Sequence, residues 1–349
     1  MNSASFYFWR TPWWRMLWIG ALGGSLFHWL HLPLAWMLGP LLANLIASQL
    51  GCAVGLHSKV RSFFLGILGL ILGGQASQET LMQVSQWPAS LGLLCLGVTV
   101  MIIVVASYFR WVAGMDRASA WFSAVPGAMT AMIMMGGQAG GDERQISLAH
   151  ALRLTFVILL VPALLWAWMP AATLSHQPML SQQPAQMEAM HLWLLLGVWP
   201  AWQLGQRLRF PTPELTGPLA WSLTWALLGF PFQSPWLLTS VTLLVLGASI
   251  GARFYGTPWQ SMVWIAKHAL AASLLGLTVA AISAWIMHWW LDVPLVTAML
   301  TMTPGGVGEM AMIALALGID PVFVAAHHLF RIIALMLLIP LLAPWWRTP

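Results

Sequence analysis

The sequence predicts an all-α integral membrane protein made of two inverted repeats, each with about five transmembrane helices plus a re-entrant or broken Pro-Gly helix. Three observations predict this fold class: the composition, a duplication at one fixed offset, and the placement of the positive charges. Of the 349 residues, 60% are hydrophobic and 7% are charged, and the mean hydropathy is +0.79. Soluble domains carry about 25% charged residues, so a soluble globular fold is excluded.

Apolar segments follow one another along the whole chain, and several approach the roughly 20 residues that a helix needs to cross a bilayer. A transmembrane β-barrel would need segments of about ten residues that alternate apolar and polar, and this pattern is absent. The 24 tryptophans gather near segment ends, which is typical of an interfacial belt. In chain order, the segments are expected near 14–30, 33–52, 62–78, 88–109, 118–137 and 145–170, and then near 191–206, 212–230, 236–252, 266–288, 295–316 and 322–345.

The second half of the chain repeats the first at a constant offset of 178 residues. "SAVPGAMTAMIM" aligns with "TMTPGGVGEMAM", and "LPLAWMLGPLLA" aligns with "FPTPELTGPLAW". The pairs that this offset matches are Pro33 and Pro211, Gly69 and Gly247, Pro126 and Pro304, Asp142 and Asp320, His150 and His328, Arg153 and Arg331, and Pro162 and Pro340. No gap is needed between the first and the last of these pairs, so the chain is a tandem duplication.

The duplication sets the expected domain organisation. Residues 1–170 form the first membrane repeat, 171–190 a polar linker, and 191–349 the second membrane repeat. The linker contains "AATLSHQPMLSQQPAQMEA", which is rich in polar residues and proline and lacks Lys and Arg.

The positive charges indicate that the second repeat is inverted. If the fifth segment of each half enters and leaves on one side, each half crosses the membrane five times, and twelve of the fourteen Lys and Arg residues fall on one face. Only Arg153 and Arg331, which lie inside spans, are left over. Basic loops of the first half align with loops of the second half that lack Lys and Arg, and the reverse also holds. Under the positive-inside rule, we expect the face that is rich in Lys and Arg, and with it both termini, to lie in the cytoplasm.

Two Pro-Gly motifs interrupt apolar segments at equivalent positions, Pro126-Gly127 and Pro304-Gly305-Gly306. Proline removes a backbone N–H, and glycine allows turns that other residues resist. Irregular backbone at membrane depth is tolerated where it is buried in protein or lines a cavity. The helix after each break would direct unpaired N–H groups at such a cavity, which favours an anion, as in transporters with discontinuous helices. The alternative is a kink that serves helix packing.

Glu309 follows the second break, and its counterpart in the first half is Ala131. A carboxylate in the bilayer is costly, so we expect it to face the protein interior with a partner. It is a candidate proton- or cation-coupling group. The alternative is a structural ion pair, for instance with Arg331.

The last span of each half carries His-x-x-Arg, as His150 with Arg153 and His328 with Arg331. Residues three apart share a helix face, so each pair could hold an anion or relay protons. Equally, each pair could cap backbone carbonyls of a broken neighbouring helix. His327 lies on a different face from His328, so the "HH" pair is a weak metal signal.

The residues predict no catalytic group, no metal and no cofactor. Cys52 and Cys95 both lie in apolar surroundings and support neither a disulfide framework nor a metal site. The net charge of +5 comes from scattered cations beside spans, so nucleic acid is not an expected partner. The expected partners are the lipid bilayer, a small solute and a coupling ion, and a homodimer is compatible with the sequence.

The two segments "SAVPGAMTAMIMMGGQAGGDERQISLAHALRL" and "TAMLTMTPGGVGEMAMIALALGIDPVFVAAHHLFRII" resemble the duplicated region of the AbrB family of bacterial inner-membrane proteins, and "LGPLLA" supports the resemblance. The soluble DNA-binding regulator of the same name is a different protein. The resemblance covers nearly the whole chain, with Ala128 in place of the second glycine of a full PGG motif. It implies a polytopic membrane protein whose relatives are labelled ammonia monooxygenase or regulator of gene expression. The sequence lacks the His and carboxylate cluster of an oxygenase.

Three hypotheses for the function follow. The first is a secondary transporter of a small anionic or weakly acidic solute, coupled to protons or a cation by an elevator or rocking movement. The second is a membrane-embedded sensor or regulator that affects gene expression. The third, which the sequence supports least, is a membrane monooxygenase, and we therefore expect that the protein is not an enzyme.

Overall fold

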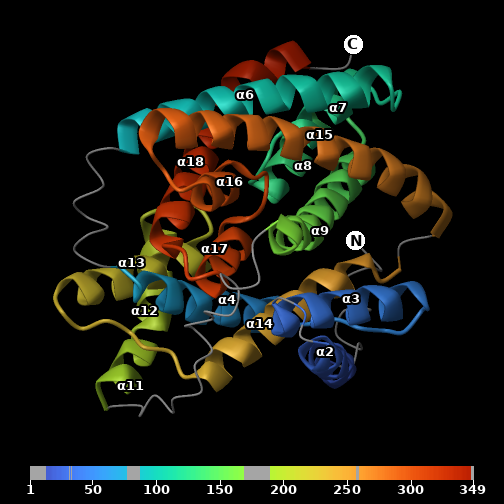
Figure 1. The fold of residues 1–349 in the computed structure, drawn as a ribbon. Coiled ribbons are helices and arrows are strands. Elements are labelled where there is room, and N and C mark those ends of the chain that lie inside the picture. Colours follow the sequence, from blue (N-terminus) through green and yellow to red (C-terminus); the bar gives the residue numbers. More distant parts are fainter. Residues whose placement is uncertain are drawn as a thin grey trace. The chain divides into compact units, whose positions relative to one another are not determined.

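The computed structural model describes residues 13–30, 32, 34–76, 87–168, 189–256 and 259–346. Throughout these ranges the regular secondary structure is helical (Figure 1). Nearly all of the predicted linker lies outside the described residues, as do the terminal cations Arg10 and Arg347.

The described helices repeat at the offset of the sequence duplication. α7 and α16 begin at Arg117 and Leu295, and α9 and α18 begin at Glu143 and Pro321, so both pairs differ by 178 residues. In chain order the helices are α2 (Trp13–Trp29), α3 (Ala35–Gln49), α4 (Ser58–Gly73), α6 (Trp87–Trp111), α7 (Arg117–Ala124), α8 (Met129–Gln138), α9 (Glu143–Trp168), α11 (Ala189–Leu196), α12 (Val198–Arg207), α13 (Pro213–Leu227), α14 (Trp236–Gly251), the 3₁₀ helix η2 (Ala252–Phe254), α15 (Trp259–Leu291), α16 (Leu295–Met302), α17 (Val307–Ala316) and α18 (Pro321–Trp346).

Five of the described helices are long and apolar enough to cross a membrane. They are Trp87–Trp111, Glu143–Leu165, Trp236–Phe254, Val263–Leu291 and Pro321–Trp346. The helices α2, α3 and α4 have 17, 15 and 16 residues, so each is somewhat shorter than a full span of about 20 residues. The predicted segments 118–137 and 295–316 are each divided into two short helices, α7 with α8 and α16 with α17, as the Pro-Gly motifs predict.

The chain divides into two compact units, and each unit takes helices from both halves of the duplication. Unit 1 comprises residues 1–80, 162–257 and 311–322, and unit 2 comprises residues 81–161, 258–310 and 323–349. Unit 1 therefore includes α2 to α4 of the first half and α11 to α14 of the second half. Both Pro-Gly motifs belong to unit 2. The compact units and the sequence repeats are thus two different divisions of the same chain.

Unit 1 is held by close helix pairs in which glycines meet backbone. A Cβ atom at Gly247 of α14 would overlap the carbonyl oxygen of Met37 in α3, and a Cβ at Gly69 of α4 would overlap the carbonyl oxygen of Leu215 in α13. Small residues let membrane helices approach to backbone contact. Because Gly69 and Met37 are the equivalents of Gly247 and Leu215, the two contacts are copies of each other with the halves exchanged.

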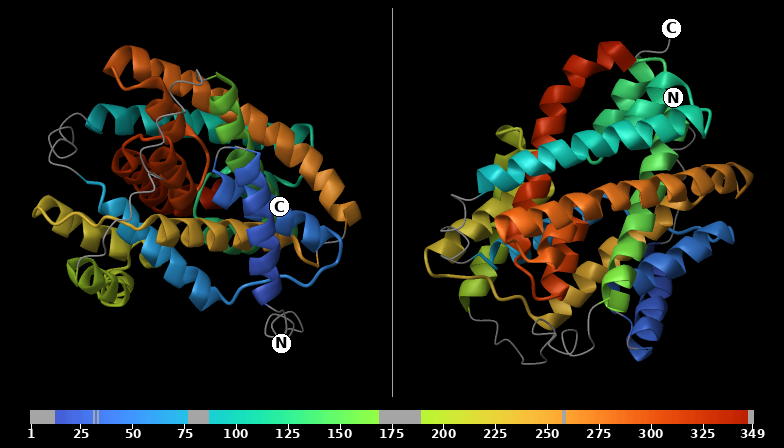
Figure 2. Two further views of the ribbon diagram at one scale, coloured as in Figure 1. Left: turned by 60° about the horizontal axis from the view of Figure 1, so that its bottom comes forward. Right: turned by 45° about the horizontal axis from the view of Figure 1, so that its top comes forward.

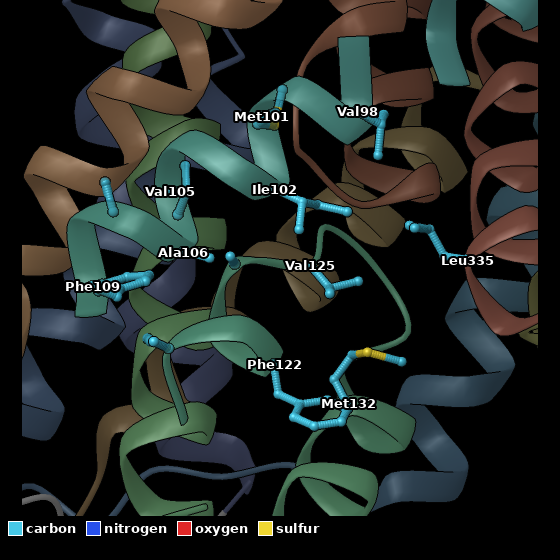
Figure 3. Close-up of a cluster of buried hydrophobic side chains, with 14 of the residues drawn as sticks. Val98, Met101, Ile102, Val105, Ala106, Phe109, Phe122, Val125, Met132 and Leu335 are labelled. Atoms are coloured by element: carbon cyan, nitrogen blue, oxygen red, sulfur yellow. The ribbon is translucent and has the colours of Figure 1, made fainter. Parts of the chain in front are cut away.

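Both halves of the chain contribute to an apolar core in unit 2. Figure 3 shows part of it, where Val98, Ile102 and Val105 of α6 lie near Val125 at the first Pro-Gly motif and Leu335 of α18. Helices α6 and α15 pack along each other in unit 2, as Figures 1 and 2 show from three directions. The core therefore packs residues of the broken helices α7, α8 and α16 against α6, α15 and α18.

Candidate functional site

The first break separates α7 from α8 at residues 125–128. Val125 is extended, with φ −64° and ψ 123°, and it is followed by Pro126, which has no N–H to continue the helix. Gly127 has φ 98°, and Ala128 has φ 47°, a left-handed conformation that non-glycine residues rarely adopt. The local sequence thus ends one helix and starts another within four residues.

The first broken segment folds back on itself as a helical hairpin. Ser119 near the start of α7 accepts a hydrogen bond through Oγ from the backbone N–H of Asp142, beyond the end of α8, at 2.7 Å. A Cβ atom at Gly141 would lie 3.0 Å from the backbone nitrogen of Ser119, and one at Gly136 would lie 3.2 Å from Cβ of Phe122. Both ends of this segment therefore lie together, with the Pro-Gly motif at the turn.

The buried residues His150 and Arg153 of α9 cap the free carbonyls at the end of α7. His150 Nε2 donates to the carbonyl oxygen of Phe122 at 2.9 Å. Arg153 donates from Nη1 to the carbonyl oxygen of Ser123 at 3.0 Å and from Nη2 to that of Val125 at 3.1 Å. A helix C-terminus carries partial negative charge, so a guanidinium group there both pairs the carbonyls and complements the helix dipole.

The second break is capped in the same way by α18. His328 Nε2 donates to the carbonyl oxygen of Leu300 at 3.0 Å. Arg331 donates from Nη1 to the carbonyl oxygen of Thr303 at 2.8 Å and from Nη2 to that of Gly305 at 2.6 Å. The capping alternative for the His-x-x-Arg pairs is therefore what the structure shows, while a role in holding an anion stays a prediction.

The two capping pairs differ at one nitrogen. Arg153 Nη2 also donates to His150 Nδ1 at 2.9 Å. In the second half, Nη2 of Arg331 is directed to Gly305, and the fully buried Nδ1 of His328 has no hydrogen-bond partner among the described residues. The first histidine has both ring nitrogens engaged, and the second keeps a free acceptor beside a buried arginine.

Glu309 lies in the first turn of α17, directly after the second break. Its side chain is half-buried, and its carboxylate occupies the space in which a Cβ atom of Gly306 would stand. A carboxylate near a helix N-terminus complements the positive end of the dipole. The predicted alternative of an ion pair with Arg331 is not observed, because the Arg331 guanidinium bonds to carbonyls of Thr303 and Gly305. The N-terminus of α8 has Ala131 at the equivalent position and no carboxylate of its own there.

Arg153 and Arg331 bring positive charge into the interior of unit 2, and no carboxylate among the described residues pairs with either of them. Their exposed fractions are 9% and 2%. Nε of each arginine has no hydrogen-bond partner in the part of the chain that the structure describes, and neither has Oγ of Ser123 beside the first break. Buried cations that lack a counter-charge favour an anion.

One polar contact of unit 2 is absent from the sequence prediction. His327 Nε2 lies 2.7 Å from Ser90 Oγ of α6, and its Nδ1 lies 2.8 Å from the carbonyl oxygen of Phe323. The ring also packs against Trp87. The adjacent histidines of "HH" thus serve different helices, as their different faces indicate, but nothing in "WPASLGLL" marks Ser90 as the partner.

The described residues contain no group of three or more His, Cys, Asp or Glu side chains that could hold a metal ion. What the arrangement brings together is two broken helices, two buried arginines and one half-buried carboxylate. Together with the long apolar helices, this defines a multi-pass α-helical membrane protein with discontinuous helices in its interior.

The chain belongs to the AbrB family, because residues 7–347 match the family described as "Transition state regulatory protein AbrB". It is 28% identical over 360 residues to "Putative regulator AbrB" of Escherichia coli (strain K12), which covers 96% of this chain and 97% of that protein. It is 24% identical over 352 residues to "Uncharacterized protein YhjN" of Bacillus subtilis (strain 168), which covers 94% of this chain and 91% of that protein. No solved structure matches the chain.

Proposed function

We propose that the protein is a secondary transporter of a small anionic or weakly acidic solute, coupled to protons or a cation, in the bacterial inner membrane. The observation that carries this proposal is the pair of buried arginines, Arg153 and Arg331, which flank the two helix breaks without a carboxylate partner among the described residues. An anion would neutralise this charge and could accept hydrogen bonds from the free N–H groups that begin α8. Glu309 is the proposed coupling group, since protonation or cation binding there would remove its repulsion of the anion.

An inverted duplication is part of the proposal, because opposed repeats give a transporter two equivalent conformations that open to opposite sides. The packing of α6 against α15 supports it. Gly97 of α6 lies against Ser283 of α15, and Tyr108 OH of α6 lies 3.0 Å from His268 Nδ1 of α15. Residue numbers therefore rise along α6 in the direction in which they fall along α15. These two helices are equivalent in the duplication and run antiparallel. Equivalent spans that point in opposite directions are what an inverted repeat requires.

A second support for inversion comes from unit 1. Gly247 and Gly251 of α14 meet the carbonyls of Met37 and Leu41 in α3, so these two helices run parallel. The helices α4 and α14 are equivalent in the duplication. If α3 and α4 are consecutive spans, they run in opposite directions. Because α14 runs parallel to α3, it then runs antiparallel to its equivalent, α4. Unit 2, which carries both breaks, is in this proposal the part that moves during alternating access.

Cysteine labelling at one pair of equivalent positions tests the inversion. Cys52 and Phe230 are separated by 178 residues and lie in the loops that precede α4 and α14. Both experiments use a protein in which Cys95 is replaced by alanine. We expect an impermeant maleimide to label the native Cys52 from the cytoplasmic side. When Cys52 is also replaced by alanine and Phe230 by cysteine, we expect the new cysteine to be labelled from the opposite side. Labelling of both cysteines from one side would exclude the inverted topology.

Transport is tested in proteoliposomes on a solid-supported membrane, with acetate, succinate and inorganic phosphate as probe anions and an imposed pH gradient. We expect charge movement or uptake with at least one probe class and its loss in Glu309→Gln and Arg331→Ala. Glu143→Gln is the matched control, since Glu143 is also a first-turn carboxylate against a glycine, Gly137, but lies away from both breaks. If both site variants transported as well as the unmodified protein, the site assignment would be wrong.

The name of the Escherichia coli relative favours one other function, a membrane-embedded sensor that affects gene expression. Such a protein would bind the same class of anion at the same site without moving it. Binding of a probe anion measured by calorimetry, with no uptake under any imposed gradient, would support the sensor over the transporter. We also propose that the protein is not an enzyme and that its partners are the lipid bilayer, the solute and the coupling ion, without nucleic acid. Metal analysis of the purified protein tests the monooxygenase alternative.

A further inference from the structure

Unit 1 contains an apolar pocket of about 930 Å³ that the proposed transport function does not use. It lies between the first half of α2, the loop and first turns that begin α4, and the middle of α14. Its lining includes Trp14, Leu17, Ala21, Phe64 and Val245. The pocket is therefore a hydrocarbon-compatible recess in the helices of one compact unit.

The shape of the pocket suits a chain molecule. Along α2 it extends from Trp13 to Ala21, which is about 12 Å at 1.5 Å per residue. Trp13 and Trp18 are 60% and 66% exposed, although both line the pocket. An acyl chain of this length fits along the recess. Because lipid tails are as apolar as the recess, the preference for one lipid over another must come from the headgroup.

One end of the pocket is positively charged. His57, which lines the pocket, is the N-cap residue of α4, and its Nδ1 accepts from the backbone N–H of Lys59. Val60 also lines the pocket, and Lys59 and Arg61 flank it on the helix surface. On α2, the Arg15 guanidinium carbon lies 5.3 Å from the ring centroid of the lining residue Trp14. Three cations are therefore immediate chain neighbours of residues that line the recess, and the N-terminus of α4 adds the positive end of a helix dipole.

The duplication supplies an internal comparison for these cations. At the equivalent positions of the second half, Lys59 and Arg61 are replaced by Leu237 and Thr239, and Arg15 is replaced by Trp193. At these three positions the positive charge is thus present in the first half and absent from the second. In our topology these positions of the first half face the cytoplasm, where anionic headgroups attract basic segments next to spans.

We propose that this pocket binds an anionic phospholipid. Its headgroup phosphate lies at the N-terminus of α4 among Lys59, Arg61 and Arg15, and one acyl chain fills the recess below Trp14. Phosphate at a helix N-terminus is a recurrent arrangement, and the tryptophans lie at the boundary between headgroup and hydrocarbon, which they prefer. This proposal does not depend on transport activity, and it is tested separately from the proposed transport function.

Native mass spectrometry of the detergent-purified full chain tests the proposal with phosphatidylglycerol and phosphatidylethanolamine as probes. We expect preferential retention of phosphatidylglycerol by the unmodified protein. Lys59→Gln with Arg61→Gln should weaken that retention, by about fivefold for each removed cation. Ala21→Phe, which fills the recess and leaves the charges in place, should reduce the retention of both lipids.

The matched control is Arg207→Gln with Arg209→Gln, which removes the same charge from exposed positions at and just after the end of α12. We expect these variants to retain phosphatidylglycerol like the unmodified protein. Equal loss in the control, or unchanged retention in the Lys59 and Arg61 variants, would overturn the proposal. So would a shift from dimer to monomer in Ala21→Phe without lipid loss, because the recess would then be an interface between copies. Competition by soluble glycerol phosphate as strong as by the lipid would assign the site to a free phosphate instead.

Discussion

Arg153 donates a hydrogen bond to His150 Nδ1 at 2.9 Å, while the equivalent nitrogen of His328 receives none among the described residues. The two halves thus share the capping of a broken helix but not the complete hydrogen-bond network. The same half that leaves His328 Nδ1 free also carries Glu309 where the first half has Ala131. Both departures from the repeat lie at the second break, so we expect the solute-coupled chemistry there and a mainly structural role for His150.

This asymmetry predicts different stability losses for two equivalent substitutions. His150→Leu leaves both the Phe122 carbonyl and an Arg153 N–H without their partner, whereas His328→Leu removes only the bond to Leu300. Each buried group left unpaired costs about 1–3 kcal/mol. The decrease in the free energy of unfolding should therefore be about 1–3 kcal/mol larger for His150→Leu than for His328→Leu. Unfolding by dodecyl sulfate in mixed micelles measures it. Equal losses would show that the Arg153–His150 bond contributes nothing.

The hairpin of the first break predicts a contrast between two buried serines of α7. Ser119→Ala removes the acceptor for the Asp142 N–H, and Ser123→Ala removes an Oγ that has no hydrogen-bond partner among the described residues. The first substitution should lower the free energy of unfolding by about 1 kcal/mol. The second should leave it unchanged or raise it slightly. Thermal unfolding of both variants in one detergent gives the comparison, and a larger loss in Ser123→Ala would contradict the hairpin contact.

The turn of the same hairpin predicts opposite effects at neighbouring positions. Ala128 has φ 47°, where a non-glycine residue is strained, so Ala128→Gly should raise the free energy of unfolding by up to about 1 kcal/mol. Gly127 has φ 98°, and an added Cβ would lie 3.2 Å from Cγ1 of Ile332. Gly127→Ala should therefore lower stability by about 1–2 kcal/mol. The paired thermal unfolding curves of these variants check both signs, and shifts in the same direction would refute this description of the turn.

The helix breaks could be predicted from the sequence because their cause is local. Proline and glycine act on the backbone at their own position, so Pro126-Gly127 and Pro304-Gly305 mark the ends of α7 and α16 closely. Because the second half repeats the first at a fixed offset, the same prediction applies to both breaks. The caps were predicted only as one of two alternatives, since the spacing of His150 and Arg153 defines their shared face but not what that face meets.

The remaining features depend on contacts between segments far apart in the chain, which local chemistry does not specify. Ser90 and His327 are 237 residues apart, and neither has a counterpart of the same kind in the other half. The grouping of early helices into unit 1 and late helices into unit 2 likewise follows from packing, such as Gly247 on Met37. A sequence repeat reports common ancestry, whereas a compact unit reports which surfaces meet.

The exchanged glycine contacts of unit 1 give a final prediction. Gly247→Ala would place a methyl group on the Met37 carbonyl, and Gly69→Ala would place one on the Leu215 carbonyl. Because both neighbours are backbone, neither can move aside without separating a helix pair. Each substitution should lower the free energy of unfolding by about 1–3 kcal/mol.

The two losses should also be similar, since the contacts are copies related by the duplication. Gly92→Ala on α6 is the control, because an added Cβ there meets nothing within 4 Å, and its effect should stay within about 0.5 kcal/mol. Dodecyl sulfate unfolding of the three variants at equal detergent concentration compares them directly. A large loss for Gly247→Ala with none for Gly69→Ala would mean that only the α3–α14 pair is closely packed in the membrane.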